Sequence, residues 1–198
     1  AIGTLGVALT RANRYAEAIP ALETATSAHT IDLDVTTADY NRIELLRNLA
    51  AARAEIGDYQ AAENTYHRAL ALAETVEAPL DIAGTHRDLG TLYARRGEHN
   101  AAIQSWSKAL EMYEQHDEYA RVARLHIDIA NVRRQTGLIR RAMKDYEKAL
   151  TAINLADDIE TRGIVLAHAA TAYVDQGDVE TARIFFLESI KIASQVND

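Results

Sequence analysis

The sequence predicts an all-α fold, an α-solenoid of five helix pairs with about ten antiparallel helices. The first observation is an internal repeat: a small residue, a turn and a helix that ends in an aromatic residue followed by Ala-Leu or close equivalents. The copies are Asn13…Ala18…Leu22…Ala25, Gly57…Ala62…Tyr66…Ala69-Leu70, Gly97…Ala102…Trp106…Ala109-Leu110, Gly137…Ala142…Tyr146…Ala149-Leu150 and Gly177…Ala182…Phe186…Ser189-Ile190. The last four copies are spaced by 40 residues, and the first lies 44 residues before the second. A repeat of this length is typical of solenoids, in which each unit buries its apolar face against its neighbours.

The second observation is a helical spacing of apolar residues within each repeat. In the third repeat one helical face carries Ile82, His86, Leu89, Gly90 and Tyr93, and a second carries Ala102, Ile103, Trp106, Ala109 and Leu110. The third observation is that a glycine separates the two helices at positions 57, 97, 137 and 177. Glycine suits the left-handed residue after a helix, and Asp58 or Asp178 can cap the helix that follows.

Small residues recur where the two helices of a pair would cross. They are Gly6, Ala50, Gly90, Ala130 and Ala170 in the first helices and Ala18, Ala62, Ala102, Ala142 and Ala182 in the second helices. A larger side chain there would push the helices apart, because overpacking costs about 1–3 kcal/mol. The large aromatic residues one turn later, at 66, 106, 146 and 186, are predicted to lie in the core.

The repeats are predicted to span residues 1–36, 37–78, 79–118, 119–158 and 159–198 of one domain, because no linker or low-complexity segment divides the chain. Repeat one departs from the others. Pro20 falls within its second helix, which we expect to begin near Tyr15 and to bend at the proline. We therefore expect repeat one to be the least stable of the five. The segment Thr30–Thr36 alternates like a strand but has no partner, so we expect a loop.

Composition narrows the possible functions. The chain has 198 residues, 48% of them apolar, a net charge of −8 and no cysteine. Without cysteine it has no disulfide and no thiolate chemistry. The negative charge opposes binding to a phosphate backbone, so nucleic acid is an unlikely partner, and no apolar run approaches the about 18 residues that span a membrane. We expect a cytoplasmic protein without a membrane partner, from whose start any original leader has been removed.

No pattern of catalytic or metal-binding residues is present. The chain lacks a phosphate-binding glycine loop, and Gly3-Thr4-Leu5-Gly6 sits in a helical pattern without the following lysine. His86 and His126 occupy the same place in adjacent repeats, where a packed histidine is expected rather than a metal ligand. The sequence therefore predicts neither an enzyme nor a cofactor or metal site.

The motif Leu89-Gly90-x-x-Tyr93, followed by Gly97, Ala102, Trp106 and Ala109-Leu110, resembles the tetratricopeptide repeat family. The 40-residue period is longer than the usual 34 residues of that family and comes within the range of HEAT and armadillo repeats. Such long repeats are similar to those of Pins-type adaptors, kinesin light chains and bacterial signalling regulators. The resemblance implies a right-handed superhelix that binds protein or peptide ligands.

The resemblance also places the exposed side of the first helices in a concave, ligand-binding groove. The groove residues it implies are Arg47, Asn48, Arg87, Asp88, Thr91, Arg124, Asp128, Asn131 and Arg134, with Ile127 on the same side. One interpretation is an arginine clamp for the carboxylates or backbone carbonyls of a peptide, possibly an acidic one. The other is internal salt bridging, because acidic and amide side chains form a row beside the arginines.

A second surface is expected at the C-terminal end. Ile184, Phe185 and Leu187 are apolar where repeats two to four have polar residues, which calls for a covering partner. That partner could be a further repeat, a following domain or a second copy in a homodimer. Since the first helix of repeat one is also short, we expect an excised portion of a longer protein. The function expected is a non-catalytic peptide-binding module in a regulatory or scaffold protein. A self-association module is the alternative, and an RNA-binding repeat is a third possibility.

Overall fold

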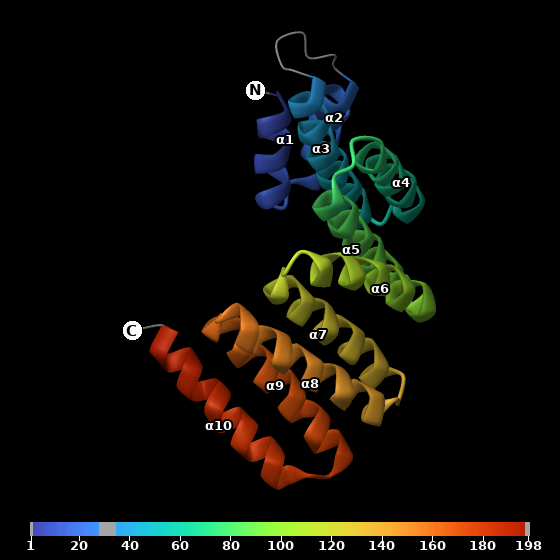
Figure 1. The fold of residues 1–198 in the computed structure, drawn as a ribbon. Coiled ribbons are helices and arrows are strands. Elements are labelled where there is room, and N and C mark those ends of the chain that lie inside the picture. Colours follow the sequence, from blue (N-terminus) through green and yellow to red (C-terminus); the bar gives the residue numbers. More distant parts are fainter. Residues whose placement is uncertain (1, 28–34, 197–198) are drawn as a thin grey trace. The chain divides into compact units, whose positions relative to one another are not determined.

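The structure, a computed structural model, describes residues 2–27 and 35–196, and the regular structure in these two ranges is entirely helical (Figure 1). The ten helices are α1 (Ile2–Arg11), α2 (Tyr15–Ser27), α3 (Val35–Glu55), α4 (Tyr59–Thr75), α5 (Pro79–Arg95), α6 (His99–Gln115), α7 (Tyr119–Gln135), α8 (Ile139–Ala156), α9 (Ile159–Gln176) and α10 (Val179–Val196). The predicted all-α fold is therefore confirmed.

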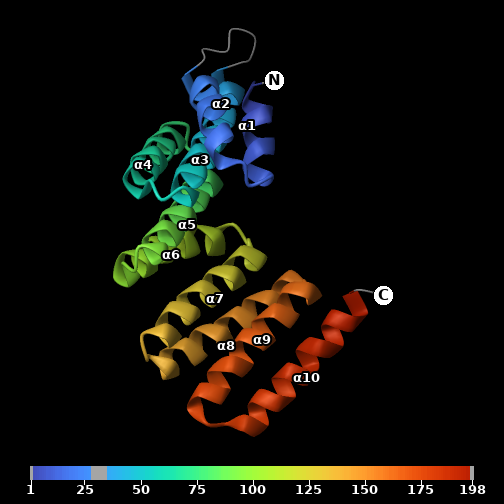
Figure 2. The same cartoon turned by 180° about the vertical axis from the view of Figure 1, so that it is seen from behind.

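The helices form two compact units, residues 1–109 and residues 110–198, with the boundary inside α6. In the first unit α1 packs on α2 and α3 on α4, and in the second unit α7 packs on α8 and α9 on α10. Both views show the two helices of each of these pairs side by side and antiparallel (Figures 1 and 2). Within each unit successive pairs also touch, through α2 and α3, α4 and α5, and α8 and α9.

The predicted glycine turns join the two helices of a pair. Gly57, Gly97, Gly137 and Gly177 have φ between +77° and +86°, the left-handed conformation that side chains disfavour. Asp58 and Asp178 cap the following helices, because their carboxylates accept hydrogen bonds from the backbone N–H groups of Ala61 at 3.2 Å and Thr181 at 3.1 Å. The turns between pairs also contain a left-handed residue, but it is Glu77, Asp117 or Asp157 rather than glycine.

Small residues at the crossings bring the helices of a pair together, as predicted. All ten predicted crossing residues are buried. A Cβ atom on Gly6 would lie 2.6 Å from Leu22 Cγ, and one on Gly90 would lie 2.4 Å from both Cδ1 and Nε1 of Trp106. Contact this close lets the Trp106 indole N–H donate a hydrogen bond of 3.1 Å to the Arg87 carbonyl.

The aromatic residue of α4 is covered by two first helices. Tyr66 of α4 packs against Ala50 and Ala54 of α3 and against Leu89 and Leu92 of α5, and it is 5% exposed. The apolar face of one helix pair is thus completed by the first helix of the next pair, which is the packing of a solenoid.

The core prediction holds for Tyr66, Trp106 and Tyr146 but is wrong for Phe186, which is 37% exposed. The reason is that no further helix packs over α10 in the described part of the chain. The predicted end surface also needs correction. Ile184 and Leu187 are more than half exposed, but Phe185 turns inward, and its ring meets the Tyr173 ring edge-on with the centroids 5.2 Å apart.

Repeat one matches its prediction in part. Helix α2 begins at Tyr15, as expected, and continues through Pro20 to Ser27. The bend and the low stability of this repeat stay predictions. Of the loop predicted for Thr30–Thr36, residues 30–34 lie outside the described ranges, and Val35 and Thr36 form the start of α3. None of the described helices combines the length and apolar character that crossing a membrane requires.

Replacing Gly90 by Ala tests the close crossing of α5 and α6. In an ordinary helix interior this change stabilises by about 1 kcal/mol. Here the new methyl group would overlap Trp106, and overpacking costs about 1–3 kcal/mol, so we expect Gly90→Ala to lower the free energy of unfolding. Urea denaturation measures the change, with Thr91→Ala on the exposed side of α5 as the control. A stability equal to that of the unmodified chain would contradict the packing described.

Candidate functional site

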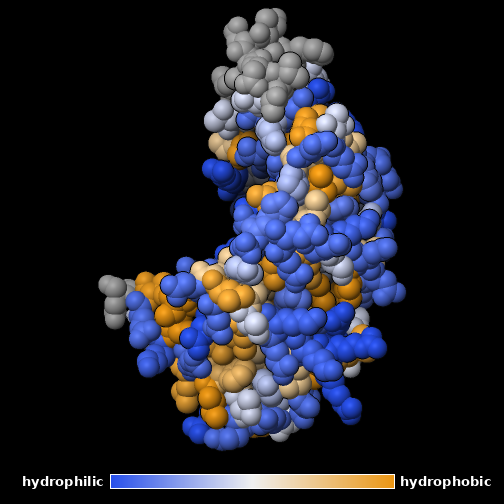
Figure 3. Space-filling model, viewed as in Figure 1, coloured by the Kyte–Doolittle hydropathy of each residue, from blue (hydrophilic) through white to orange (hydrophobic). Residues whose placement is uncertain are grey.

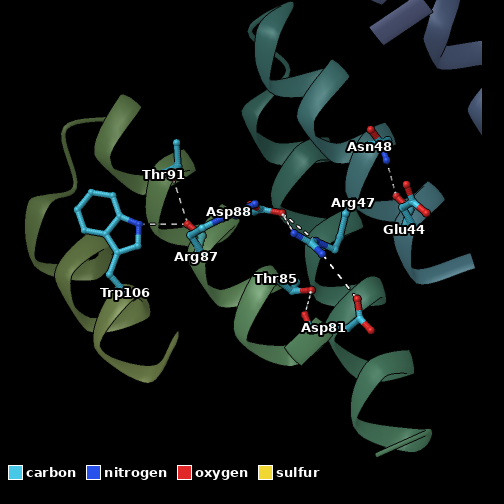
Figure 4. Close-up of polar contacts among 9 residues, drawn as sticks. All are labelled: Glu44, Arg47, Asn48, Asp81, Thr85, Arg87, Asp88, Thr91 and Trp106. Atoms are coloured by element: carbon cyan, nitrogen blue, oxygen red, sulfur yellow. Dashed lines mark hydrogen bonds and ion pairs between the residues drawn. The ribbon is translucent and has the colours of Figure 1, made fainter. Parts of the chain in front are cut away.

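In the first unit two arginines of the predicted polar row, Arg47 and Arg87, both bond to Asp88 (Figure 4). The Arg47 guanidinium donates to Asp88 Oδ2 from Nε at 2.9 Å, and its Nη2 lies 2.8 Å from the same oxygen. The Arg87 guanidinium donates to Asp88 Oδ1 from Nε at 3.0 Å and from Nη2 at 2.7 Å. One carboxylate, 17% exposed, therefore orients two guanidinium groups from adjacent repeats.

The two arginines differ in their surroundings. The Arg47 side chain is 20% exposed, and its Nη1 also lies 3.7 Å from Asp81. Its guanidinium lies against Gly84, where a Cβ atom would come within 2.8 Å of both terminal nitrogens. The Arg87 side chain is 43% exposed although both of its hydrogen bonds to Asp88 are well formed. Internal salt bridging thus describes Arg47, whereas Arg87 is both oriented and accessible to a ligand.

The two other predicted residues of this unit, Asn48 and Thr91, bond to their own helices. Asn48 Nδ2 donates to the Glu44 carbonyl at 2.9 Å, and the Thr91 hydroxyl donates to the Arg87 carbonyl at 3.2 Å. These bonds fix both side chains on the same helices, α3 and α5, that carry Arg47 and Arg87. The exposed polar side of α3 and α5 formed by Asn48, Arg87 and Thr91 is called the first-helix face below.

The second unit has an ion pair between the same kinds of helix, at positions seven residues further along the repeat than Arg47 and Asp88. Arg134 of α7 donates to Asp175 of α9 at 2.9 Å, and each pair joins residues 41 positions apart. The hydrogen bond to Asp175 raises the pKa of Arg134. Asn131 accepts a hydrogen bond of 2.6 Å from the Tyr146 hydroxyl, which leaves its amide N–H groups to donate elsewhere. Arg134 and Asn131 are therefore built into the packing between helices.

The remaining predicted residues of α7 do not form one continuous polar row. Arg124 is exposed and Asp128 is partly buried. Ile127, which the resemblance placed on the exposed side, is only 6% exposed, so that part of the prediction is wrong. It occupies the position of Arg47 and Arg87 but packs in the core, because a branched apolar side chain has no polar end to reach solvent. Among the arginines of the groove prediction, Arg87 and Arg124 remain the outward-facing cations.

Sequence reasoning missed a second set of polar contacts, which hold the helices of each pair together. Arg53 donates to the Thr65 hydroxyl at 2.5 Å, and Arg133 contacts the buried Asp145. Each pair joins a first helix to the second helix of the same repeat, and the second pair lies 80 residues, or two repeats, after the first. Tyr173 and Phe185 occupy these same positions in the last repeat, which explains why Phe185 turns inward. Comparing repeats position by position could have found this signal.

A further polar network links α4 with α5. Glu63 accepts hydrogen bonds of 2.7 Å from both the Tyr93 hydroxyl and the Arg96 guanidinium. Burial opposes ionisation of Glu63, but these two hydrogen bonds outweigh it and lower its pKa. Burial together with the hydrogen bond to Glu63 raises the pKa of Tyr93 to about 12. The network is structural, because its hydrogen bonds join two successive repeats.

The second unit also has a surface groove of about 640 Å³ between α6, α7 and α8. Sequence reasoning did not predict this groove. It is lined by residues of α6, α7 and α8, among them Tyr119, His126, Lys144 and Lys148. His126 is 7% exposed, and its Nδ1 is buried without a hydrogen-bond partner. Burial, with a smaller contribution from Lys148, lowers the pKa of His126 to about 4. His126 is therefore packed as a neutral residue, as its sequence position predicted.

Across the described ranges, no three histidine or acidic side chains are grouped so as to hold a metal ion.

Two family models match the chain. A model described as tetratricopeptide repeat matches residues 41–115 and 81–156, and a second model of that description matches residues 165–196. None of the curated proteins compared with the chain matches it.

Several solved structures share the fold. BtubC (BKLC) from P. vanneervenii has a TM-score of 0.78 at 18% identity, over 99% of this chain and 80% of that one. A putative kinesin light chain from Podosopora anserina, with nearly identical TPR-like repeats, has a TM-score of 0.75 at 15% identity, over 98% and 94%. The Rap conjugation gene regulator of plasmid pLS20, in complex with the Phr* peptide, has a TM-score of 0.73 at 17% identity, over 98% and 52%. At these identities the likeness shows the fold, an α-solenoid.

Replacing Asp88 by Asn tests whether this carboxylate anchors the arginines. The change keeps the shape of the side chain but removes the charge shared by Arg47 and Arg87, and Arg47 is largely buried. We expect the free energy of unfolding to fall by about 1–3 kcal/mol, the usual cost of leaving a charged donor poorly paired. Chemical denaturation measures this loss. Glu180→Gln, which removes an exposed partner of Arg183, should change stability little. Equal effects of the two substitutions would refute a special role for Asp88.

Replacing His126 by Leu, the residue at the equivalent positions 46 and 166, tests the buried imidazole. Because the pKa of His126 is about 4 in the folded protein and near 6.5 in an unfolded chain, the unfolded state binds the proton first. Stability is therefore lost as the pH falls from 6.5 towards 4, by up to about 1.4 kcal/mol per pH unit. We expect His126→Leu to flatten this slope in denaturation curves recorded across the range. The surface variant His116→Leu serves as the control and should keep the slope of the unmodified chain.

Proposed function

Because the chain belongs to the tetratricopeptide repeat family, as its sequence motifs predicted, we propose that it is a non-catalytic module that binds a protein or peptide segment. The segment lies along the first-helix face of α3 and α5. The observation that carries this proposal is the geometry of Arg87. Its guanidinium is held in place by two hydrogen bonds to Asp88, yet 43% of the side chain is exposed.

A fixed but exposed guanidinium favours binding because little side-chain entropy is lost when the ligand arrives. Arginine presents planar N–H groups that match a carboxylate, and it remains charged at all physiological pH values. Arg47 beneath it holds Asp88 from the other side, so Asp88 stays in place when a ligand contacts Arg87. Asn48 and Thr91 add polar groups on either side of Arg87. The ligand chemistry that fits best is an acidic peptide.

The likeness to a Rap regulator supports a peptide ligand. That protein carries the same fold and was solved in complex with the Phr* peptide. The family relationship and the exposed, polar first helices point in the same direction, since tetratricopeptide-type solenoids present side chains on extended surfaces suited to recognition.

Charge reversal at Arg87 tests the proposal. The probes are pools of fluorescein-labelled random short peptides, one acid-rich, one base-rich and one neutral, and binding is followed by fluorescence polarisation. We expect the unmodified chain to prefer the acid-rich pool. The variant Arg87→Glu should bind that pool at least about tenfold more weakly, a loss of about 1.4 kcal/mol.

The matched control reverses one arginine of a second helix in the same unit, Arg68→Glu, which changes the net charge equally. Both variants should keep the helical circular-dichroism signal and the unfolding midpoint of the unmodified chain. If the control loses as much affinity as the test variant, attraction by overall charge explains the binding and the first-helix face does not. An absence of preference for the acid-rich pool would refute an acidic ligand.

A further inference from the structure

The last helix exposes an apolar face. On α10, Phe186 is 37% exposed, Leu187 54% and Ile190 64%, and Val174 at the end of α9 is 48% exposed. Hydrophobic surface is visible over the region of α10 in Figure 3. Exposed apolar residues that gather on one face, rather than scattering singly, mark an interaction surface.

The repeat itself shows what kind of element covers this face. Val174, Phe186 and Ile190 lie 120 residues after Ala54, Tyr66 and Leu70, so they hold equivalent positions three repeats later. In the first unit those residues form one core cluster with Leu89 and Leu92 of the following first helix, α5. The face on α9 and α10 therefore has the composition and register that accept a first helix.

The opposite end of the chain exposes the matching part. Ile2 and Leu5 on α1 are 52% and 55% exposed, and Ala8 on the same side is exposed as well. Their equivalents in α3 are Leu46, Leu49 and Ala52, which are at most 2% exposed. Leu5 and Ala8 also correspond to Leu89 and Leu92 of α5, the residues that cover Tyr66. Helix α1 thus exposes apolar residues at the positions that cover the preceding second helix elsewhere in the chain. Such a covering helix is what α10 lacks.

We propose that copies of this chain associate head to tail, with α1 of one copy packing on α9 and α10 of the next as the first helix of a continuing solenoid. Charge supports this register. Glu55 and Arg95, at equivalent positions of successive first helices, form an ion pair of 2.7 Å. At the junction the same two positions are held by Arg11 of one copy and by Asp175 of the next, whose carboxylate also accepts a hydrogen bond from Arg134, and α1 contains no acidic residue.

The proposed junction is heterologous, because two different surfaces meet. Each junction leaves one α1 face and one α10 face available, so association continues into open chains or closes into rings. A symmetric dimer that joins two α10 faces would instead stop at two copies. Head-to-tail association does not depend on the first-helix face, and its test does not involve peptide binding.

Two single substitutions, each placing a charge on one face, separate these arrangements. Leu5→Glu disables the α1 face and Phe186→Glu disables the α10 face, and both side chains are exposed, so the fold should persist. The mass of the 198-residue chain is measured by sedimentation against concentration, and circular dichroism checks the fold of each variant. Leu155→Glu, at a residue of α8 that is 64% exposed and belongs to neither face, is the matched control.

We expect the mass of the unmodified chain and of Leu155→Glu to rise with concentration beyond that of a dimer. Each end variant alone should need at least about tenfold higher concentration to associate. An equimolar mixture of Leu5→Glu and Phe186→Glu should form dimers and nothing larger, because only the intact α1 of one variant and the intact α10 of the other can join.

Three results would overturn the proposal. One is an unmodified chain that stays monomeric at every concentration, which would leave the α10 face to another partner. The second is a dimer abolished by Phe186→Glu but insensitive to Leu5→Glu, which would indicate a symmetric contact between two α10 faces. The third is an equimolar mixture of the two variants that stays monomeric.

Discussion

The structure depends on one constraint: a second helix is buried only when a first helix from the next repeat packs over it. Tyr66 illustrates this, because Ala50 and Ala54 of its own pair cover one side and Leu89 and Leu92 of the next pair cover the other. The small residues at the crossings make such contact possible. With no Cβ atom on Gly90, the Trp106 ring can lie against α5 and bond to its backbone. Burial is therefore a property shared between neighbouring repeats, as expected for a one-dimensional array.

The polar contacts follow the same geometry. Arg47 with Asp88 and Arg134 with Asp175 each join consecutive first helices inside one unit, so they form only when the repeats are stacked. Such pairs cost desolvation and contribute modest stability, but they orient charged groups at fixed places. Arg87 benefits from this arrangement, since Asp88 is already held by Arg47 from the opposite side. A contact between stacked repeats thereby fixes the position of an exposed cation.

The sequence was sufficient for the helices, the turns and most of the core, because these depend on short-range rules. A glycine after a helix and an alanine at a crossing each have one dominant physical explanation, and Gly57 and Ala62 behave accordingly. The environments of Arg47 and Arg87 were not predictable, because identical residues at equivalent positions differ only in the neighbours that their long side chains meet. Phe185 turns inward and Phe186 is exposed, the reverse of the prediction, for another reason. Phe186 follows the core pattern of Tyr66 and Tyr146, but burial also needs the next helix, which sequence periodicity within one repeat does not reveal.

The two exposed ends follow from the same constraint, with consequences for stability. In a repeat array the end units bury less apolar surface than the central ones, so local unfolding begins there. Helix α1 has only ten residues and pairs with α2, which contains Pro20, and for this reason we expect the first pair to be the least stable. Covering Leu5 and Phe186 would bury apolar side chains at both ends at once. Any partner that binds only the folded ends stabilises them by mass action, so association at these faces and the folding of the end repeats are thermodynamically coupled.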